Sequence, residues 1–220
     1  QARKGNQMIV VVSAMGDTTD DLIKKSNEIL ANPGKREMDM LLSTGEQISI
    51  ALVAMAIQAL GEQAISFTGG QAGIITNNSY TKARINSINH YRIKEALNQG
   101  KIVIVAGFQG VDEQGNITTL GRGGSDTTAI ALAARMHAVR CEIYTDVDGV
   151  FTADPVLVPE ARKIKKISHD EMSEMAILGA KVLYHRAIDI ARNYGVDILV
   201  KSSFDNGNGT IVQTREEIPM

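Results

Sequence analysis

Apolar residues along the chain follow two patterns, short uninterrupted runs and longer repeats with helical spacing. Three runs are continuous enough to predict strands buried on both faces, at residues 8–13, 101–106 and 142–145. Further strands are expected at 64–68 and 197–201, and a hairpin at 111–120. Helices are expected at 20–31, 36–60, 88–99, 125–137, 170–178 and 180–194. This alternation predicts one α/β domain with a mainly parallel sheet and helices on both faces.

Proteins of this class bind ligands beyond the carboxyl ends of the strands, on the loops that follow them. Four loops of this chain meet that condition, and they comprise residues 15–20, 68–74, 107–110 and 146–155. We therefore searched these loops, and the segments packed beside them, for residues that carry chemistry.

A glycine-rich segment at 121–126, Gly-Arg-Gly-Gly-Ser-Asp, is the strongest local signal. Its backbone N–H groups and the following helix N-terminus suit an anion, and the Arg122 guanidinium suits a carboxylate or phosphate. The alternative is a glycine turn with Ser125 as N-cap and Asp126 favouring the helix dipole. The segment matches neither the dinucleotide-binding fingerprint nor the Walker phosphate loop.

Two carboxylates, Asp146 and Asp148, follow Thr145 at the end of a predicted strand. Asp and Gly at such a place can form a plain turn. Carboxylates beside an anion site also suit a magnesium ion or ribose hydroxyls.

Glu46 stands in the middle of the helix predicted at 36–60, with Leu42, Ile50 and Val53 on its own face. A carboxylate among apolar neighbours is costly unless it is paired. Its partner is either a lysine or arginine of this chain or the ammonium group of a ligand. Gly45 beside it leaves room for a close approach.

Lys181 falls near the start of the helix predicted at 180–194. A lysine there opposes the helix dipole, and solvation at the surface is the ordinary explanation. A phosphate bound to the same turn would make that lysine favourable.

The amino-acid composition limits which binding partners and which cellular compartment we expect. Lys plus Arg number 23 and Asp plus Glu 25, a net charge of −2, which gives no indication of nucleic acid or an anionic membrane. The single cysteine excludes an internal disulfide and favours a cytoplasmic setting, and the four histidines show no metal-ligand spacing. No uninterrupted apolar run reaches membrane-spanning length.

Six segments together resemble the aspartokinases of the amino acid kinase superfamily. They are residues 8–20 (MIVVVSAMGDTTD), 36–48 (REMDMLLSTGEQI), 68–73 (TGGQAG), 106–109 (AGFQ), 119–128 (TLGRGGSDTT) and 144–155 (YTDVDGVFTADP). The resemblance covers nearly the whole chain and implies a three-layer α/β/α sandwich. It implies transfer of the ATP γ-phosphate, with Mg²⁺, to the β-carboxylate of L-aspartate, the first step toward lysine, threonine, methionine and diaminopimelate.

The resemblance also implies residue roles. Thr19, Glu46 and Arg122 match positions that bind aspartate, and we expect Asp126 to organise the cationic groups or the metal. The nucleotide-binding positions match Thr145, Asp146, Phe151, Val156, Lys181 and Val182. Among the residues expected to be catalytic, Lys181 with Mg²⁺ would offset phosphate charge, and Arg122 would hold a substrate carboxylate.

The chain departs from the family pattern at two places that bear on activity. Val156 stands where the family usually has an arginine that contacts nucleotide. The Lys-Phe-Gly-Gly-Thr-Ser segment and the regulatory ACT domains of the family have no counterpart in residues 1–220. We therefore expect an amino acid kinase catalytic domain that lacks part of its phosphate site, with little activity alone, and a homo-oligomer in the full-length form.

Two alternatives stay open at this stage. One is another kinase of the same fold, such as a glutamate 5-kinase or a uridylate kinase. The other is a non-catalytic module that binds aspartate. The pairing of Glu46 with Arg122 suits the two charged ends of an amino acid and favours the aspartokinase.

Overall fold

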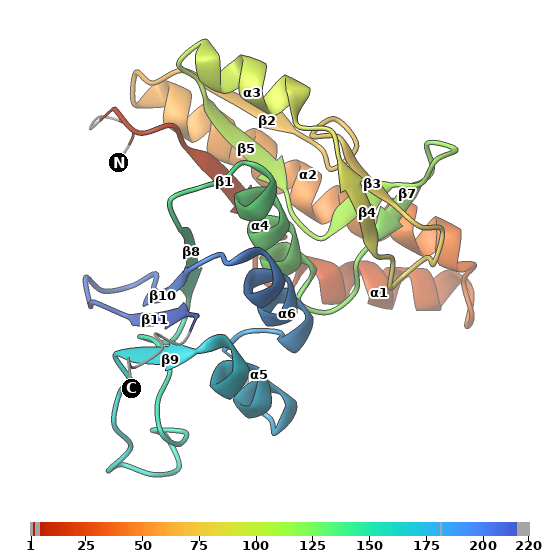
Figure 1. The fold of residues 1–220 in the computed structure, drawn as a ribbon. Coiled ribbons are helices and arrows are strands. Elements are labelled where there is room, and N and C mark those ends of the chain that lie inside the picture. The colour runs from red at the N-terminus through yellow and green to blue at the C-terminus, as the bar shows by residue number, and fades with distance from the viewer. Residues whose placement is uncertain (1, 3–4, 181, 215–220) are drawn as a thin grey trace. The chain divides into compact units, whose positions relative to one another are not determined.

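The structure is a computed structural model that describes residue 2, residues 5–180 and residues 182–214. The chain divides into two compact units, residues 1–129 and 130–220 (Figure 1). The first unit contains β1 (Ile9–Val12), α1 (Thr18–Ile29), α2 (Lys35–Ala59), β2 (Ala64–Phe67), β3 (Ile74–Thr76), β4 (Ile85–Ile88), α3 (Tyr91–Asn98), β5 (Ile102–Ala106), β6 (Gln109–Val111), β7 (Ile117–Thr119) and the start of α4 (Gly124–Arg135). The second contains β8 (Cys141–Thr145), β9 (Lys166–Ser168), α5 (His169–Ile177), α6 (His185–Tyr194), β10 (Ile198–Ser202) and β11 (Thr210–Gln213).

The core of the first unit is a parallel sheet in the order β1-β5-β2. Its central strand β5 pairs on both edges, with Val105 opposite Val11 on one side and Phe67 on the other. Residues 103–106 are fully buried, which is why this strand reads as a continuous apolar run. Helix α2 packs against all three strands and contributes Ile50 to the core. The three strands therefore end at the same edge of the sheet, and the loops that follow them begin there.

A second sheet of the first unit runs in the order β4-β3-β6-β7 and is mostly antiparallel. The hairpin expected at 111–120 is confirmed as β6 and β7, with Gly110 opposite Thr118. Strands β3 and β4 were not predicted, because their residues alternate weakly and β4 is half exposed.

The second unit is built on a mixed sheet in the order β8-β10-β11-β9. β8 is parallel to β10, and β11 is antiparallel to β10 and parallel to β9. Helices α5 and α6 pack against each other, and Met172 and Ile188 are fully buried. A capping box formed by Ser168 and Glu171 begins α5. The expected α/β class with parallel-rich sheets is thus confirmed.

One helix differs clearly from the sequence prediction. We expected a helix over 180–194, but α6 begins at His185 and ends at Tyr194, and its C-cap Gly195 has the left-handed φ of 63°. Gly179, with a φ of 113°, follows α5, and residues 182 and 183 form a turn and a bend. The helical start expected beside position 181 is therefore wrong, and Lys181 itself lies outside the described residues.

Within the described part of the chain, α2 alone is long and apolar enough to cross a membrane by length and composition. Core helices of globular domains pass the same test. Here α2 packs against β1, β2 and β5 and carries two buried carboxylates, Asp39 and Glu46. It serves as the core helix of the first unit.

Candidate acceptor and nucleotide sites

An open cavity of about 250 Å³ lies in the first unit, where the loops after β1 and β5 meet α2 and the start of α4. Four residues expected to bind or organise the acceptor, Thr19, Glu46, Arg122 and Asp126, all line it. The remaining lining residues are Ser13, Ala14, Phe108, Gly121, Gly123, Gly124 and Ser125. The structure therefore brings together residues that are more than 100 positions apart in the sequence.

Glu46 is the most unusual group in this cavity, being only 3% exposed. Its Oε1 accepts a hydrogen bond from the Ala14 N–H at 3.1 Å. Its Oε2 is buried and has no hydrogen-bond partner among the described residues, and no described lysine or arginine pairs with it. Burial raises the pKa of this carboxyl, and the backbone N–H groups of Glu46 itself and of Ala14 offset part of that effect.

Gly45 explains how the chain after β1 comes so close to Glu46. A Cβ at this position would lie 2.8 Å from the Ala14 Cβ, closer than carbon atoms pack. The space beside Gly45 is therefore filled by the loop after β1, which supplies the Ala14 N–H to Glu46. Any larger residue would push that loop away from the carboxylate.

The glycine-rich segment, residues 121–126, also lines the cavity. Gly121 and Gly123 have φ values of 76° and 68°, which favour glycine, and the Gly124 N–H bonds to the Gly121 carbonyl at 3.0 Å. Helix α4 begins at Gly124, so Ser125 lies in its first turn and is not the N-cap considered from the sequence. Arg122 is exposed between the two glycines and lines the cavity.

Asp39 is a buried residue that sequence reasoning missed. It is fully buried on α2, seven residues before Glu46. Its carboxylate accepts hydrogen bonds from the N–H of Thr81, the N–H of Thr119 and the hydroxyl of Thr119. Burial raises its pKa, and these hydrogen bonds counteract the rise. The available signal was a second carboxylate on the apolar face of α2.

In the second unit, the expected nucleotide-binding positions follow β8. Thr145 ends that strand, and its hydroxyl donates to the Asp146 carboxylate at 3.0 Å. Phe151 pairs with Lys163 in an isolated antiparallel bridge, whereas Val156 is 87% exposed. Val182 is half-buried. Lys181, the remaining position of this set, lies outside the described residues.

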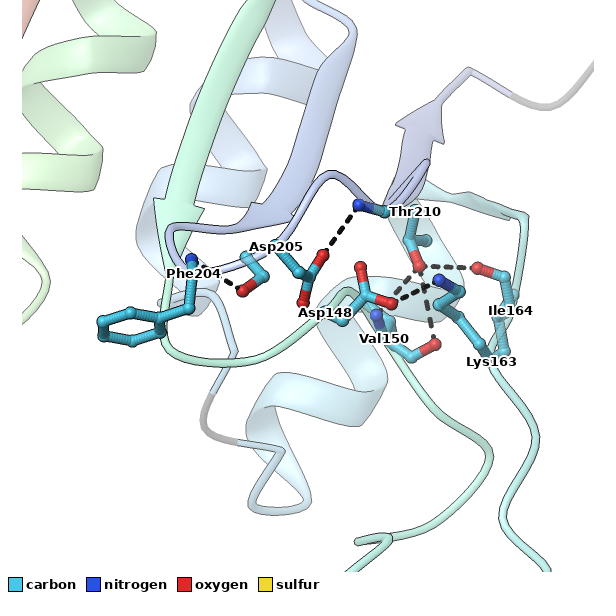
Figure 2. A network of polar contacts seen from close by, with 9 residues as sticks. Asp148, Val150, Lys163, Ile164, Phe204, Asp205 and Thr210 are labelled. Atoms are coloured by element: carbon cyan, nitrogen blue, oxygen red, sulfur yellow. Dashed lines mark hydrogen bonds and ion pairs between the residues drawn. The ribbon is translucent and has the colours of Figure 1, made fainter.

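The segment that carries Phe151 is held by β11 through one hydroxyl. Figure 2 shows Thr210 lying between Val150 and Ile164, far apart in the sequence from both. Its Oγ1 accepts from the Val150 N–H at 2.8 Å and donates to the Ile164 carbonyl at 2.5 Å. The Lys163 ammonium also pairs with Asp148 at 2.5 Å (Figure 2). Both ends of the 150–164 loop are thus fixed to the sheet.

The described residues contain no group of three or more histidine, cysteine, aspartate or glutamate side chains that could hold a metal ion. A magnesium ion carried by a triphosphate needs only one or two protein carboxylates. Asp126 at the cavity and Asp146 after β8 are carboxylates of that kind.

Comparison with known proteins agrees with this geometry. The profile of the amino acid kinase family matches residues 1–202. The aspartokinase of Geobacillus stearothermophilus is 59% identical over 220 residues, which are 100% of this chain and 54% of that protein. The chain thus spans about half the length of the curated relatives it matches.

Two solved structures are similar to the chain. The aspartate kinase from Synechocystis has a TM-score of 0.84 at 50% identity, covering 99% of this chain and 36% of its own. Aspartokinase III from E. coli, solved with aspartate and ADP, has a TM-score of 0.81 at 33% identity, covering 91% of this chain and 46% of its own.

Proposed function

Because the chain belongs to the amino acid kinase family, we propose that it is the catalytic domain of an aspartate kinase, which transfers the ATP γ-phosphate to the β-carboxylate of L-aspartate. The observation that carries this proposal is the unpartnered Oε2 of Glu46, buried at a cavity that Arg122 also lines. A buried carboxylate oxygen without a partner is suited to a ligand ammonium group.

The acceptor's charges have counterparts around this cavity. Glu46 would bind the α-ammonium group, and the planar guanidinium of Arg122 would bind a carboxylate. Thr19 would supply a hydroxyl, and the N–H groups at the start of α4 would favour a negatively charged group. An amino acid with a second carboxylate, such as aspartate, satisfies all of these groups at once.

The nucleotide would be bound by the segment from Thr145 to Val156, with Lys181 and Val182. Aspartokinase III, which resembles this chain, was solved with ADP, in keeping with a nucleotide substrate. Lys181 would offset phosphate charge, and Mg²⁺ would arrive bound to the triphosphate, with Asp126 available to orient it. In this segment Val156 supplies no charge to the phosphates.

The proposed reaction depends more on positioning the β-carboxylate against the triphosphate than on proton transfer. The β-carboxylate is already an anion at neutral pH, so it can attack without a general base. Its oxygen bonds to the γ-phosphorus while the bond to the β,γ-bridging oxygen breaks, and ADP leaves with the electron pair. Arg122 and Lys181 would reduce the repulsion between the carboxylate and the triphosphate.

The wider setting follows from the same proposal. Aspartyl phosphate would feed lysine, threonine, methionine and diaminopimelate synthesis in the cytoplasm. The full-length protein would be a homo-oligomer.

Calorimetry with L-aspartate and with MgATP, each titrated separately into the chain, tests the proposal. Arg122→Ala is expected to weaken L-aspartate binding strongly and to spare MgATP, whereas Lys181→Ala is expected to do the reverse. Arg84→Ala changes an exposed arginine of the first unit outside the cavity and serves as the control. Equal effects of the first two variants on both ligands would overturn the assignments. Binding of L-aspartate without MgATP would favour a non-catalytic binding module.

A further inference from the structure

The buried carboxylate of Asp39 lies outside the cavity, yet its hydrogen bonds end on the segments that shape it. Its Oδ2 accepts from the Thr119 N–H at 2.8 Å and its Oδ1 accepts from the Thr119 hydroxyl at 2.7 Å. Both oxygens also accept from the Thr81 N–H, at 3.0 and 2.9 Å. Burying an anion is costly unless donors saturate it, and here four hydrogen bonds do so.

Thr119 is the last residue of β7, three positions before Arg122. The next residue, Leu120, is 2% exposed, and its N–H bonds to the Phe108 carbonyl at 2.8 Å. Gly121 follows Leu120 directly, so no further residue separates these fixed positions from the loop that carries Arg122. The hydrogen bonds at Thr119 therefore set the point from which the Arg122 loop departs.

Thr81 supports the same loop from the other side. A Cβ on Gly121 would lie 2.9 Å from the Thr81 carbonyl oxygen, so the two backbones are in contact. Thr81 has a φ of 69°, a strained conformation for a β-branched residue that persists only where its surroundings enforce it. The two hydrogen bonds from the Thr81 N–H to Asp39 provide that enforcement.

We propose that Asp39 is a positioning residue for the acceptor site: it holds Thr119 and Thr81 so that Gly121 and Arg122 take the conformation that binds the acceptor's carboxylate. The inference rests on the proposed function for the identity of the ligand. It assigns to α2 a second role in the site, distinct from the direct contact made by Glu46.

The sharpest test removes one donor and leaves Asp39 in place. Thr119→Val deletes the hydroxyl that bonds to Asp39, and Thr119→Ser keeps it. Thr118→Val is a matched control on the same strand, because Thr118 is equally buried and its hydroxyl pairs with Thr76 at 2.6 Å. Asp39→Asn is the direct variant, and the threonine series decides the question if that variant does not fold.

Calorimetry should show that Thr119→Val raises the Kd for L-aspartate roughly tenfold, the equivalent of one hydrogen bond. The Kd for MgATP should not change, and Thr119→Ser should restore L-aspartate affinity. Thr118→Val should lower the melting temperature about as much as Thr119→Val does, because each variant loses one buried hydrogen bond. It should leave the Kd for L-aspartate within about twofold. Equal Kd values for L-aspartate in Thr119→Val and Thr118→Val would overturn the positioning role.

Hydrogen exchange separates this inference from the proposed function. Backbone amides of residues 119–126 should exchange faster in Thr119→Val than in Thr118→Val, with no ligand present. If the unsubstituted chain binds no L-aspartate, the proposed function fails, and the exchange comparison alone decides the positioning role. Unchanged exchange across residues 119–126 in Thr119→Val would then refute it.

Discussion

Replacing Glu46 by glutamine should move stability and ligand affinity in opposite directions. In the folded protein burial raises the pKa of this carboxyl above its unfolded value. A raised folded pKa contributes stability only at low pH, and that contribution is lost as the pH rises through the folded pKa. At neutral pH the raised pKa of the buried carboxyl therefore costs stability. Glutamine removes the charge and keeps an oxygen that can accept from the Ala14 N–H.

The expected sizes follow from the contacts of the two carboxylate oxygens. A buried charged oxygen without a partner is a penalty on the order of 1 kcal/mol or more, so Glu46→Gln should stabilise the ligand-free chain at neutral pH by about that amount. The same oxygen is the proposed partner of the acceptor ammonium. A hydrogen bond between charged groups contributes about 1.5–3 kcal/mol, so L-aspartate affinity should fall roughly 10- to 150-fold.

Urea unfolding followed by far-ultraviolet circular dichroism measures the first effect, since the chain has no tryptophan to report by fluorescence. The gain should shrink as the pH falls from neutral toward about 4, near the unperturbed glutamate pKa. Calorimetry measures the second effect. Glu37→Gln, an exposed carboxylate on the same helix that pairs with Arg36, should change neither quantity appreciably. A Glu46→Gln chain that is less stable at neutral pH, or that binds L-aspartate normally, would refute the reasoning.

Two further predictions concern the nucleotide side. Thr210→Val leaves the Val150 N–H buried without its acceptor. The variant should therefore destabilise the second unit by about 1–3 kcal/mol in urea unfolding and weaken MgATP binding. Thr210→Ser should be near neutral, and equal losses in both variants would contradict the role of the hydroxyl. Val156→Arg adds a cation at an exposed position and should strengthen MgATP binding several-fold at low salt, with less gain at high salt. Val139→Arg, a fully exposed site before β8, should leave calorimetric MgATP affinity unchanged, and the same gain there would show a general charge effect.

The sequence was sufficient to predict the strands β1, β2, β5, β8 and β10 and the long helix α2. Burial on both faces was expected for three strands and holds for β5, whereas β1 is half-buried and β8 alternates between buried residues and more exposed ones such as Tyr144. The helical repeat of α2 continues over its full length. β3 and β4 were not predicted because they are short strands and β4 is largely exposed, so they leave no regular pattern of apolar and polar residues. The helix expected at 180–194 failed at its start, since the repeat that begins at His185 carries no signal for the turn preceding it.

Residues of the candidate site could be predicted from the sequence where a charged side chain was unusual for its position. Glu46 stood out as a charge on an apolar face, and Arg122 as a cation between glycines. Asp39 lies on the same face of α2, but its partners are the N–H groups of Thr81 and Thr119 and the Thr119 hydroxyl. They lie 42 and 80 residues away, and no local pattern reveals such contacts. Thr210 was missed for the same reason, because its hydroxyl bonds only to the backbone of two other segments.

Under the proposed function, the selectivity of the acceptor site follows from the opposite charges of Glu46 and Arg122. The glycine segment offers a guanidinium and N–H groups, which any carboxylate could satisfy, including one without an amine. Glu46 cannot accept such a ligand without cost, because its Oε2 would stay buried and unpaired beside a newly bound anion. A simple amine could pair with Glu46 but would gain nothing from Arg122, whose exposed guanidinium stays hydrated. A ligand that brings both an ammonium group and a carboxylate gains from both residues, so the unpaired oxygen that destabilises the free chain also disfavours acceptors without an amine.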